Sequence, residues 1–363
     1  MNRGEFAARV LLFLLLLGMA LLLVWLADLL LLLFASVLFA VILSSAATTL
    51  DAYSGIGRGW SLSIVAVLLL LLVSGASFLF GRRLAVQVDG LAQAIPSGVA
   101  ALRALLSDYS WGQRVIDEAQ HINYASAGSD MLGRMVHVVT SALDVITDTV
   151  LIFFSGLYLA SQPGLYLRGI LSLVPRPYRA RMASILAELY DALRNWMLGQ
   201  LVSMAVVGVM FGVALMLIGV RSPIVLGLIA ALSEFIPLVG PVVATIPALL
   251  AALSQGYMMV VWVTVAFLVI QQTESNLLVP FIQRRAVHLP PVLALFGTVL
   301  FGLIFGIAGL LFANPLVVSI MVVVRMAYVN DALGGPEDED AAGLRNLTTG
   351  PGLGSREIGA AAK

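Results

Sequence analysis

Long stretches without a charged side chain constrain this sequence more than any other feature. Asp, Glu, Lys and Arg are absent from residues 10–27, 29–50, 235–273 and 286–324. A helix that crosses a membrane needs about 20 mostly apolar residues to span about 30 Å of hydrocarbon. The pattern therefore predicts an all-α polytopic membrane protein.

Composition excludes several other classes of protein. Hydrophobic residues make up 61% of the chain and charged residues 11%, whereas a soluble domain carries about 25% charged residues. The 20 basic and 20 acidic residues leave no net charge to hold a nucleic acid. No catalytic motif is present, there is no cysteine, and the three histidines are far apart in sequence. We expect no enzymatic activity, cofactor or metal. The expected partners are the lipid bilayer, a small polar solute or ion, and further copies of the chain in a homo-oligomer.

The N-terminal region, residues 1–81, is predicted to hold three spans. The first two are separated only by Asp28, which we interpret as the tip of a tight hairpin, and the third covers residues 61–80. Arg3 and Arg9 precede a leucine run, as in a signal peptide. Because no small-residue cleavage site follows that run, we interpret it as a retained signal-anchor.

Residues 82–142 differ from the spans around them because charged side chains return. Apolar residues recur there at helical spacing, at Leu91, Ile95, Val99, Leu102 and Leu106. The segment is predicted to form amphipathic helices on the extracytoplasmic side. It is too short for an independent enzyme.

Residues 143–330 are predicted to form the transmembrane core. Spans are expected at 143–160 and 200–220, and between them a basic helix carries an apolar stripe over residues 182–197 that suits a membrane surface or a neighbouring element. Prolines and glycines interrupt the regions 223–253 and 291–324, which are uncharged apart from Glu234. Because proline removes a backbone donor, both regions are predicted to be broken or re-entrant hairpins around a central polar region. The total is about seven to eight transmembrane helices.

The basic loops predict an orientation. Arginines concentrate near the N-terminus and in the segment that follows residue 163, which places both termini in the cytoplasm and the protein in the inner membrane. Residues 331–363 contain an acidic run and few large apolar side chains, so we expect a disordered cytoplasmic tail.

A small set of polar residues lies within apolar surroundings, where a carboxylate is costly unless it faces an interior path. Glu274 belongs to six consecutive polar residues, after which apolar sequence resumes, and Gln271, Glu274 and Ser275 share a helical face. Glu234 precedes a proline-rich break whose unwound backbone could coordinate a cation. The alternatives are a helix end that emerges into water and a carboxylate at the membrane interface. The candidates for a transport path are Glu274, Gln271, Asn276, Glu234, Pro237, Gly240 and Pro241.

Two G-x-x-x-G patterns occur, at Gly208–Gly212 and at Gly302–Gly306. Such spacing is typical of helices whose backbones approach closely in a membrane. We therefore expect both to mark helix packing.

Three segments of the core resemble one family of bacterial permeases, the autoinducer-2 exporter (AI-2E) family. They are LGLIAALSEFIPLVGP at 226–241, QQTESNLLVP at 271–280 and FGIAGLLFANPL at 305–316. Leu238 and Pro290 depart from the family pattern, so no specific substrate is transferred. The resemblance implies an inner-membrane permease whose motif core contains Glu274, Asn276, Pro237, Gly240 and Pro241.

The resemblance also implies what such a permease moves. Family members are associated with export of autoinducer-2, and some with sodium–proton exchange. The expected function is movement of a small polar solute or ion, with export of autoinducer-2-like signals implied by the resemblance. Two alternatives are a sodium/proton antiporter and a non-transporting scaffold that binds a partner through residues 82–142.

Overall fold

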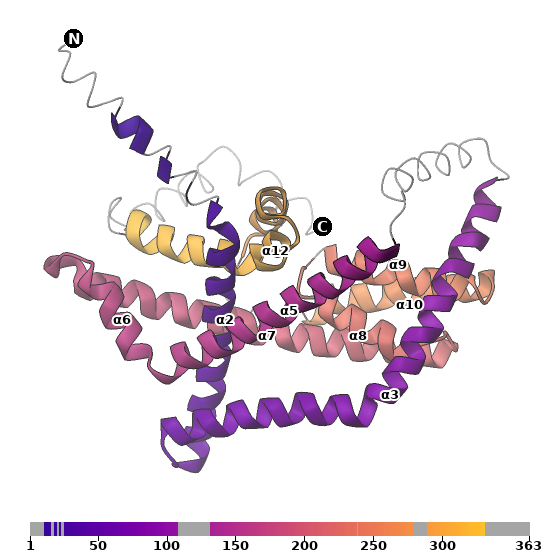
Figure 1. Cartoon of the computed structure of the whole chain (residues 1–363), viewed down its shortest axis with the longest axis horizontal. Coiled ribbons are helices and arrows are strands. Elements are labelled where there is room, and N and C mark those ends of the chain that lie inside the picture. The colour runs from indigo at the N-terminus through magenta and orange to yellow at the C-terminus, as the bar shows by residue number, and fades with distance from the viewer. Residues whose placement is uncertain are drawn as a thin grey trace, which may run out of the picture.

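The computed structural model is built from helices throughout the part of the chain that it describes (Figure 1). The described residues are 11–15, 18–19, 22, 25–107, 131–237, 239–278, 280 and 289–330. The α-helices are α2 (Ala27–Ser54), α3 (Arg58–Ser107), α5 (Met131–Ser161), α6 (Pro163–Ser172), α7 (Arg179–Ile218), α8 (Pro223–Ser233), α9 (Val239–Leu253), α10 (Tyr257–Thr273) and α12 (Pro291–Val324). Shorter helical turns are η1 (Arg176–Tyr178), η2 (Glu274–Leu278) and η3 (Arg325–Asn330).

The length and composition of the helices confirm that the chain is a membrane protein. Among the described residues, five helices are long and apolar enough to cross a bilayer, or six if the bent pair α5 and α6 counts as one span. α8 and α9 have only 11 and 15 residues, and at 1.5 Å per residue α9 is about 22 Å long. They are too short to span about 30 Å of hydrocarbon. The protein is an all-α polytopic membrane protein, and its span count is close to the predicted one.

The predicted hairpin tip at Asp28 is wrong. Asp28 lies in the first turn of α2, and the chain is helical on both sides of it. The Leu26 amide donates to the Leu22 carbonyl and the Leu30 amide to the Leu26 carbonyl, each at 2.9 Å. Asp28 is exposed on the surface of this helical stretch, so this single charge does not require a turn.

Two helices are longer than the sequence pattern suggests. α3 contains 50 residues, and the expected boundary at residues 81 and 82 falls inside it, although Figure 1 shows the helix changing direction along its length. α7 contains 40 residues and unites the basic amphipathic stripe with the following span. Its stripe packs on α2, where Leu193 and Met197 are buried against Leu38 and Val41. Of the two predicted positions for this stripe, the structure shows the one against a neighbouring element.

The first predicted hairpin is formed by α8 and α9. Its turn brings the helices so close that a Cβ on Gly240 would lie 1.9 Å from the Ser233 carbonyl oxygen. α3 holds the other end, since the Gln87 side-chain oxygen accepts the Ile224 and Val225 amides at 3.0 and 3.3 Å. Gln87 thereby satisfies two of the free amides at the start of α8.

The second predicted hairpin lies within α12, and it turns at Gly306. This glycine has φ +63° and ψ −142°, a conformation that is essentially restricted to glycine. Close contacts between the two arms show that the chain reverses there. A Cβ on Gly309 would lie 2.0 Å from the Phe301 carbonyl oxygen, and one on Gly297 would lie 2.4 Å from the Val317 side chain. In a straight helix, residues 297 and 317 would be about 30 Å apart.

The two G-x-x-x-G patterns have different roles. Gly208 and Gly212 face α8, where a Cβ on Gly208 would lie 2.5 Å from the Ala231 Cβ and one on Gly227 would lie 2.8 Å from the Gly212 Cα. This first pattern marks close helix packing, as predicted. In the second, Gly302 also marks close packing, since its Cβ would lie 2.5 Å from the Leu310 side chain, whereas Gly306 is the turn residue.

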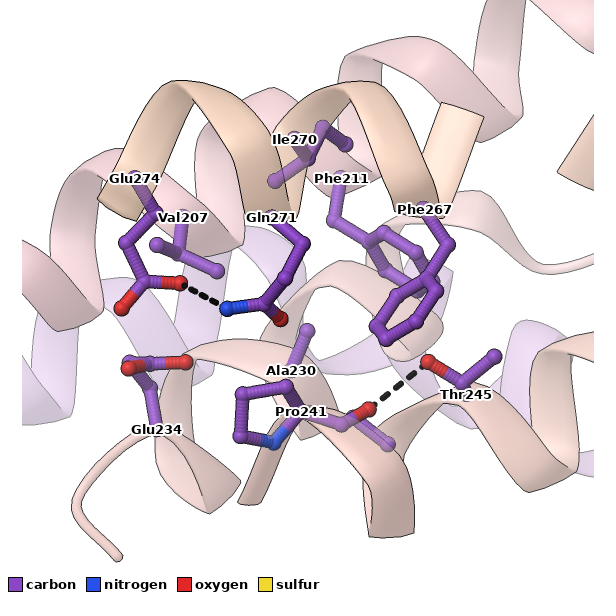
Figure 2. A pocket seen from close by; sticks show the side chains of 11 residues that line it. Val207, Phe211, Ala230, Glu234, Pro241, Thr245, Phe267, Ile270, Gln271 and Glu274 are labelled. Atoms are coloured by element: carbon purple, nitrogen blue, oxygen red, sulfur yellow. Dashed lines mark hydrogen bonds between the residues drawn. The ribbon is translucent and has the colours of Figure 1, made fainter. Parts of the chain in front are cut away.

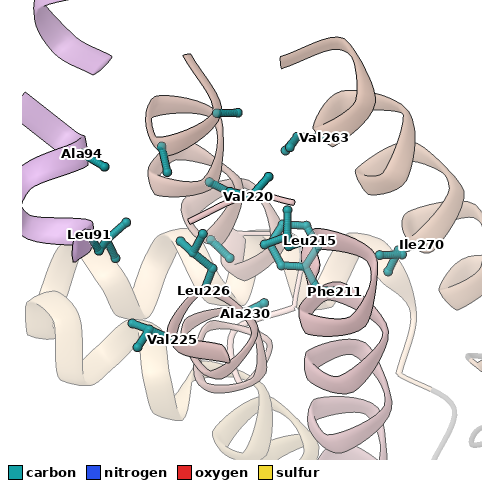
Figure 3. Close-up of a cluster of buried hydrophobic side chains, with 14 of the residues drawn as sticks. Leu91, Ala94, Phe211, Leu215, Val220, Val225, Leu226, Ala230, Val263 and Ile270 are labelled. Atoms are coloured by element: carbon teal, nitrogen blue, oxygen red, sulfur yellow. The ribbon is translucent and has the colours of Figure 1, made fainter. Parts of the chain in front are cut away.

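The main core joins α3, α7, α8, α9 and α10. Phe211 and Leu215 of α7 and Leu226 of α8 are almost fully buried in it. Figure 3 shows Leu91 and Ala94 of α3 directed into the same cluster. Residues 82–107, expected outside the bilayer as a separate segment, therefore place their apolar face on the first hairpin. Residues 108–130 lie outside the described part of the chain.

Candidate functional site

A small pocket lies where α7, the α8–α9 hairpin and α10 meet (Figure 2). Its volume is about 20 Å³. Two carboxyl groups and one amide project into it. The rest of the lining is apolar apart from one hydroxyl group. The lining residues are Val207, Phe211, Ala230, Glu234, Pro241, Ala244, Thr245, Phe267, Ile270, Gln271 and Glu274.

Glu234 enters the pocket from the end of α8. It caps that helix, with its amide donating to the Ala230 carbonyl at 3.0 Å. Its side chain is only 2% exposed, and Oε2 has no hydrogen-bond partner among the described residues. The Glu234 carbonyl accepts a 2.6 Å hydrogen bond from the Gln200 side chain of α7. This bond fixes the tip of the hairpin to α7.

Glu274 enters from the opposite wall, where α10 gives way to the π-helical turn η2. π-helical turns inside α-helices are rare and are frequent at functional sites. The Glu274 side chain is 9% exposed, and its Oε2 accepts a 3.2 Å hydrogen bond from the Gln271 side chain. Of the face predicted from helical spacing, Gln271 and Glu274 point inward, whereas Ser275 is exposed.

The two carboxyl groups face each other across the pocket (Figure 2) and are close enough to interact electrostatically. No basic side chain lines the pocket. Two like charges 4 Å apart cost about 4 kcal/mol at an effective dielectric constant of about 20, and burial adds the cost of desolvating each one. The arrangement therefore suits a bound proton or cation between the carboxyl groups. A volume of about 20 Å³ holds about one water-sized species.

The proline- and glycine-rich turn forms the floor of the pocket. Pro241 lines it, and its carbonyl accepts the Thr245 hydroxyl at 2.7 Å. Gly240 is buried, and its amide donates to the Ile236 carbonyl at 2.8 Å. Each of these carbonyls already accepts one hydrogen bond, whereas Glu234 Oε2 has no hydrogen-bond partner among the described residues.

The seven candidate residues thus occupy three kinds of position. Glu234, Gln271, Glu274 and Pro241 line the pocket. Gly240 and the half-buried Pro237 shape the turn beside it, and Asn276 is exposed on η2. The second hairpin contributes no lining residue, so the prediction that both hairpins surround one polar region holds only for the first.

Sequence reasoning missed two polar residues at the site. Gln200 and Thr245 each stand in a long apolar helix, and neither attracts notice as a charged residue would. For Thr245 the available signal was a hydroxyl close to Pro241 and Pro247, where free backbone groups need partners. No local signal marked Gln200, whose partner lies 34 residues away in the sequence.

Comparison of the sequence with protein families identifies the family of this chain. The profile of the AI-2E family transporters matches residues 11–328, which include every residue of the pocket. The chain belongs to the AI-2E transporter family.

This family membership agrees with individual relatives. The chain is 29% identical over 177 residues to the Bacillus subtilis protein named "Putative transport protein YrrI" and 24% identical over 291 residues to "Putative transport protein YueF" of the same organism. It is 27% identical over 196 residues to "Putative permease PerM" of Escherichia coli. These alignments cover 49%, 76% and 53% of this chain.

The AI-2E family member spans about half the length of two of these relatives, 50% of YrrI and 54% of PerM, and 77% of YueF. All three names describe transport proteins or permeases. The family match and the apolar helices identify this chain as a multi-pass membrane protein.

Proposed function

We propose that this AI-2E family member is a secondary transporter whose Glu234–Glu274 pair binds a proton or a small monovalent cation. The observation that carries the proposal is the pair itself, which consists of two buried carboxyl groups facing each other with no basic residue in the pocket lining. A scaffold would gain nothing from the cost of burying them.

The placement of the pair on two separate elements suggests how binding drives transport. Glu234 is carried by the hairpin and Glu274 by the turn after α10. Without a cation or proton the two charges repel, so the hairpin and α10 are pushed apart, and a bound ion draws them together. The ion thus favours the closed arrangement by its differential affinity, which is what a ligand needs to shift a conformational equilibrium.

Sodium–proton exchange, or ion-coupled movement of a small polar solute, follows most directly from this site. The resemblance also implies export of autoinducer-2-like signals, but the pocket has the volume of about one water molecule. Location in a bacterial inner membrane with both termini cytoplasmic, and assembly as a homo-oligomer, belong to the same proposal. The scaffold alternative is less favoured, since the face of α3 that carries Leu91 and Ala94 is covered by the protein itself.

Proteoliposomes provide the test. A sodium gradient is imposed and proton movement is followed with an internal pH dye. Glu234→Gln and Glu274→Gln each keep the shape of the side chain and remove its charge, so we expect each to reduce sodium-driven proton flux at least tenfold. Asp148→Asn, which removes an exposed carboxylate from α5, is the matched control and retains the flux.

Thermal unfolding in detergent separates loss of the site from loss of the fold. At 100 times its dissociation constant, a ligand stabilises the folded state by about 2.7 kcal/mol, so sodium raises the unfolding temperature of the wild type and not of the Gln variants. Wild-type flux in both Gln variants, with wild-type stabilisation by sodium, would refute the proposal.

A further inference from the structure

A second, larger cavity lies about the start of α7, away from the carboxylate pocket. It occupies about 470 Å³ between α2, α6 and α7, within the range of about 300–1,000 Å³ that is typical of ligand pockets. Its α6 wall consists of five residues that share one helical face: Pro163, Tyr166, Leu167, Ile170 and Leu171. None of the α6 residues is buried, so the protein leaves this groove, which we call the α6 groove, open.

The position of α6 indicates what surrounds the groove. α6 departs from α5 at an angle of 83°. Since α5 carries an apolar span, a helix at nearly a right angle to it runs along the membrane surface, with its apolar face toward the acyl chains. The α6 groove therefore opens where lipid head groups meet the hydrocarbon.

Three arginines lie on or between the two helices, α6 and α7, that border the α6 groove, although none is among its lining residues. Arg168 lies on α6, Arg176 in η1 and Arg179 at the start of α7, and all three are exposed. Arg179 precedes the groove residue Ala183 by one helical turn, which places it on the same face of α7.

These arginines are available to an outside anion. Arg168 and Arg179 donate only to backbone carbonyls, those of Gly164 at 2.9 Å and Val174 at 3.0 Å among others. Among the described residues none of the three forms an ion pair. Asp191 is the one charged residue that lines the groove, so the three arginines on the bordering elements outnumber the acidic residues of its lining.

We propose that the α6 groove binds an anionic phospholipid, with an acyl chain along its apolar wall and the head-group phosphate held by Arg168, Arg176 and Arg179. Guanidinium groups match phosphate in charge and geometry. A soluble anion would not use the apolar wall, and a neutral lipid would not use the three positive charges. This inference is independent of the proposed ion site.

Native mass spectrometry of the full-length protein in detergent tests the proposal. Phosphatidylglycerol and phosphatidylcholine with identical acyl chains are added in equal amounts, and the lipid adducts are counted. We expect a several-fold preference for phosphatidylglycerol in the wild type. We expect the preference to be lost in the triple variant Arg168→Gln/Arg176→Gln/Arg179→Gln, which removes the three exposed charges. Ala187→Trp places a large side chain in the groove, and we expect it to reduce the number of bound phosphatidylglycerol molecules.

Arg82→Gln/Arg83→Gln is the matched control, since it removes exposed charges from α3 and keeps the preference. Equal binding of both lipids by the wild type, or the same loss of preference in the control, would overturn the proposal in favour of general surface attraction. Competition by inorganic phosphate alone would also overturn it. A change of oligomeric state in Ala187→Trp without a change in lipid binding would assign the groove to a second copy of the chain.

Discussion

The two broken hairpins arise from the same kind of sequence and serve different purposes. Both come from long apolar regions interrupted by proline and glycine, and both reverse the chain. The turn of the α8–α9 hairpin carries Glu234 into a pocket opposite Glu274. The α12 hairpin packs instead through apolar contacts, with Phe312 edge-on to Phe34 of α2 and Val318 buried against α7.

The comparison shows that a break in an apolar helix does not by itself make a polar site. Proline and glycine determine where the chain can reverse. What distinguishes the first hairpin is a carboxyl group at its turn and a second carboxyl group on a helix that meets it. The function of a hairpin therefore depends on the side chain at its turn and on the group that this side chain meets. Equivalent substitutions in the two hairpins can test this difference.

The largest expected difference concerns the glycines of the two turns. In Gly240→Ala the new methyl group would lie 1.9 Å from a backbone carbonyl, so we expect a loss of about 3 kcal/mol or more in stability. In Gly306→Ala nothing lies within 4 Å of the new methyl group, and the backbone strain alone costs about 1–3 kcal/mol. Thermal unfolding in detergent measures both.

Gly169→Ala is the control for these variants, because its methyl group meets no atom within 4 Å and its backbone is helical. It should unfold at or above the wild-type temperature. A smaller loss in Gly240→Ala than in Gly306→Ala would show that the first turn is less tightly closed than the structure indicates.

A smaller effect is expected from Gln200→Ala, which removes the hydrogen bond that ties the first hairpin to α7. One backbone acceptor is left unpaired, which costs about 1 kcal/mol, and the displaced Glu234 should reduce transport several-fold. Gln255→Ala removes a comparable amide-to-carbonyl bond, 3.2 Å long, at the far end of α9 and should leave transport unchanged. Equal transport rates in the two variants would mean that the hairpin tip needs no anchor.

The smallest effect is expected in the second hairpin, from Asn314→Leu. Asn314 is 4% exposed, and its side-chain oxygen has no hydrogen-bond partner among the described residues. Replacing an unpaired polar group with an apolar one of similar size is neutral or stabilising by about 1 kcal/mol. We expect unchanged transport in the flux assay. A loss as large as that of Glu234→Gln would reveal a second polar site and end the distinction between the hairpins.

Much of the fold follows from the sequence because burial in a bilayer imposes simple rules. Uncharged length predicts the spans, and proline and glycine predict the two reversals. Helical spacing predicts that Gln271 and Glu274 share a face, and a hydrogen bond joins them in the structure.

The errors have local physical causes. A single charge at Asp28 suggested a turn, yet a carboxylate exposed on the surface of a helix does not interrupt it. The change from amphipathic to apolar pattern within α7 suggested two elements, but a helix can continue through a change of surroundings when no residue interrupts it.

The meeting of Glu234 with Glu274 could not be predicted from spacing along the chain. The two residues are carried by different helices, and their approach depends on how α8, α9 and α10 pack against α7. The anchor at Gln200 depends on the same packing. Each polar residue could be identified singly from its apolar surroundings, but their arrangement is a property of the tertiary structure.

α7 has a mechanical consequence that extends beyond either site. It contains 40 residues and no proline, so it is about 60 Å long and lacks the usual cause of a sharp kink. Its first turns border the α6 groove, its middle carries Gln200, and its later turns line the carboxylate pocket. One continuous helix therefore joins the α6 groove, the anchored hairpin tip and the carboxylate pocket, so a shift of α7 at any one of them is transmitted to the other two.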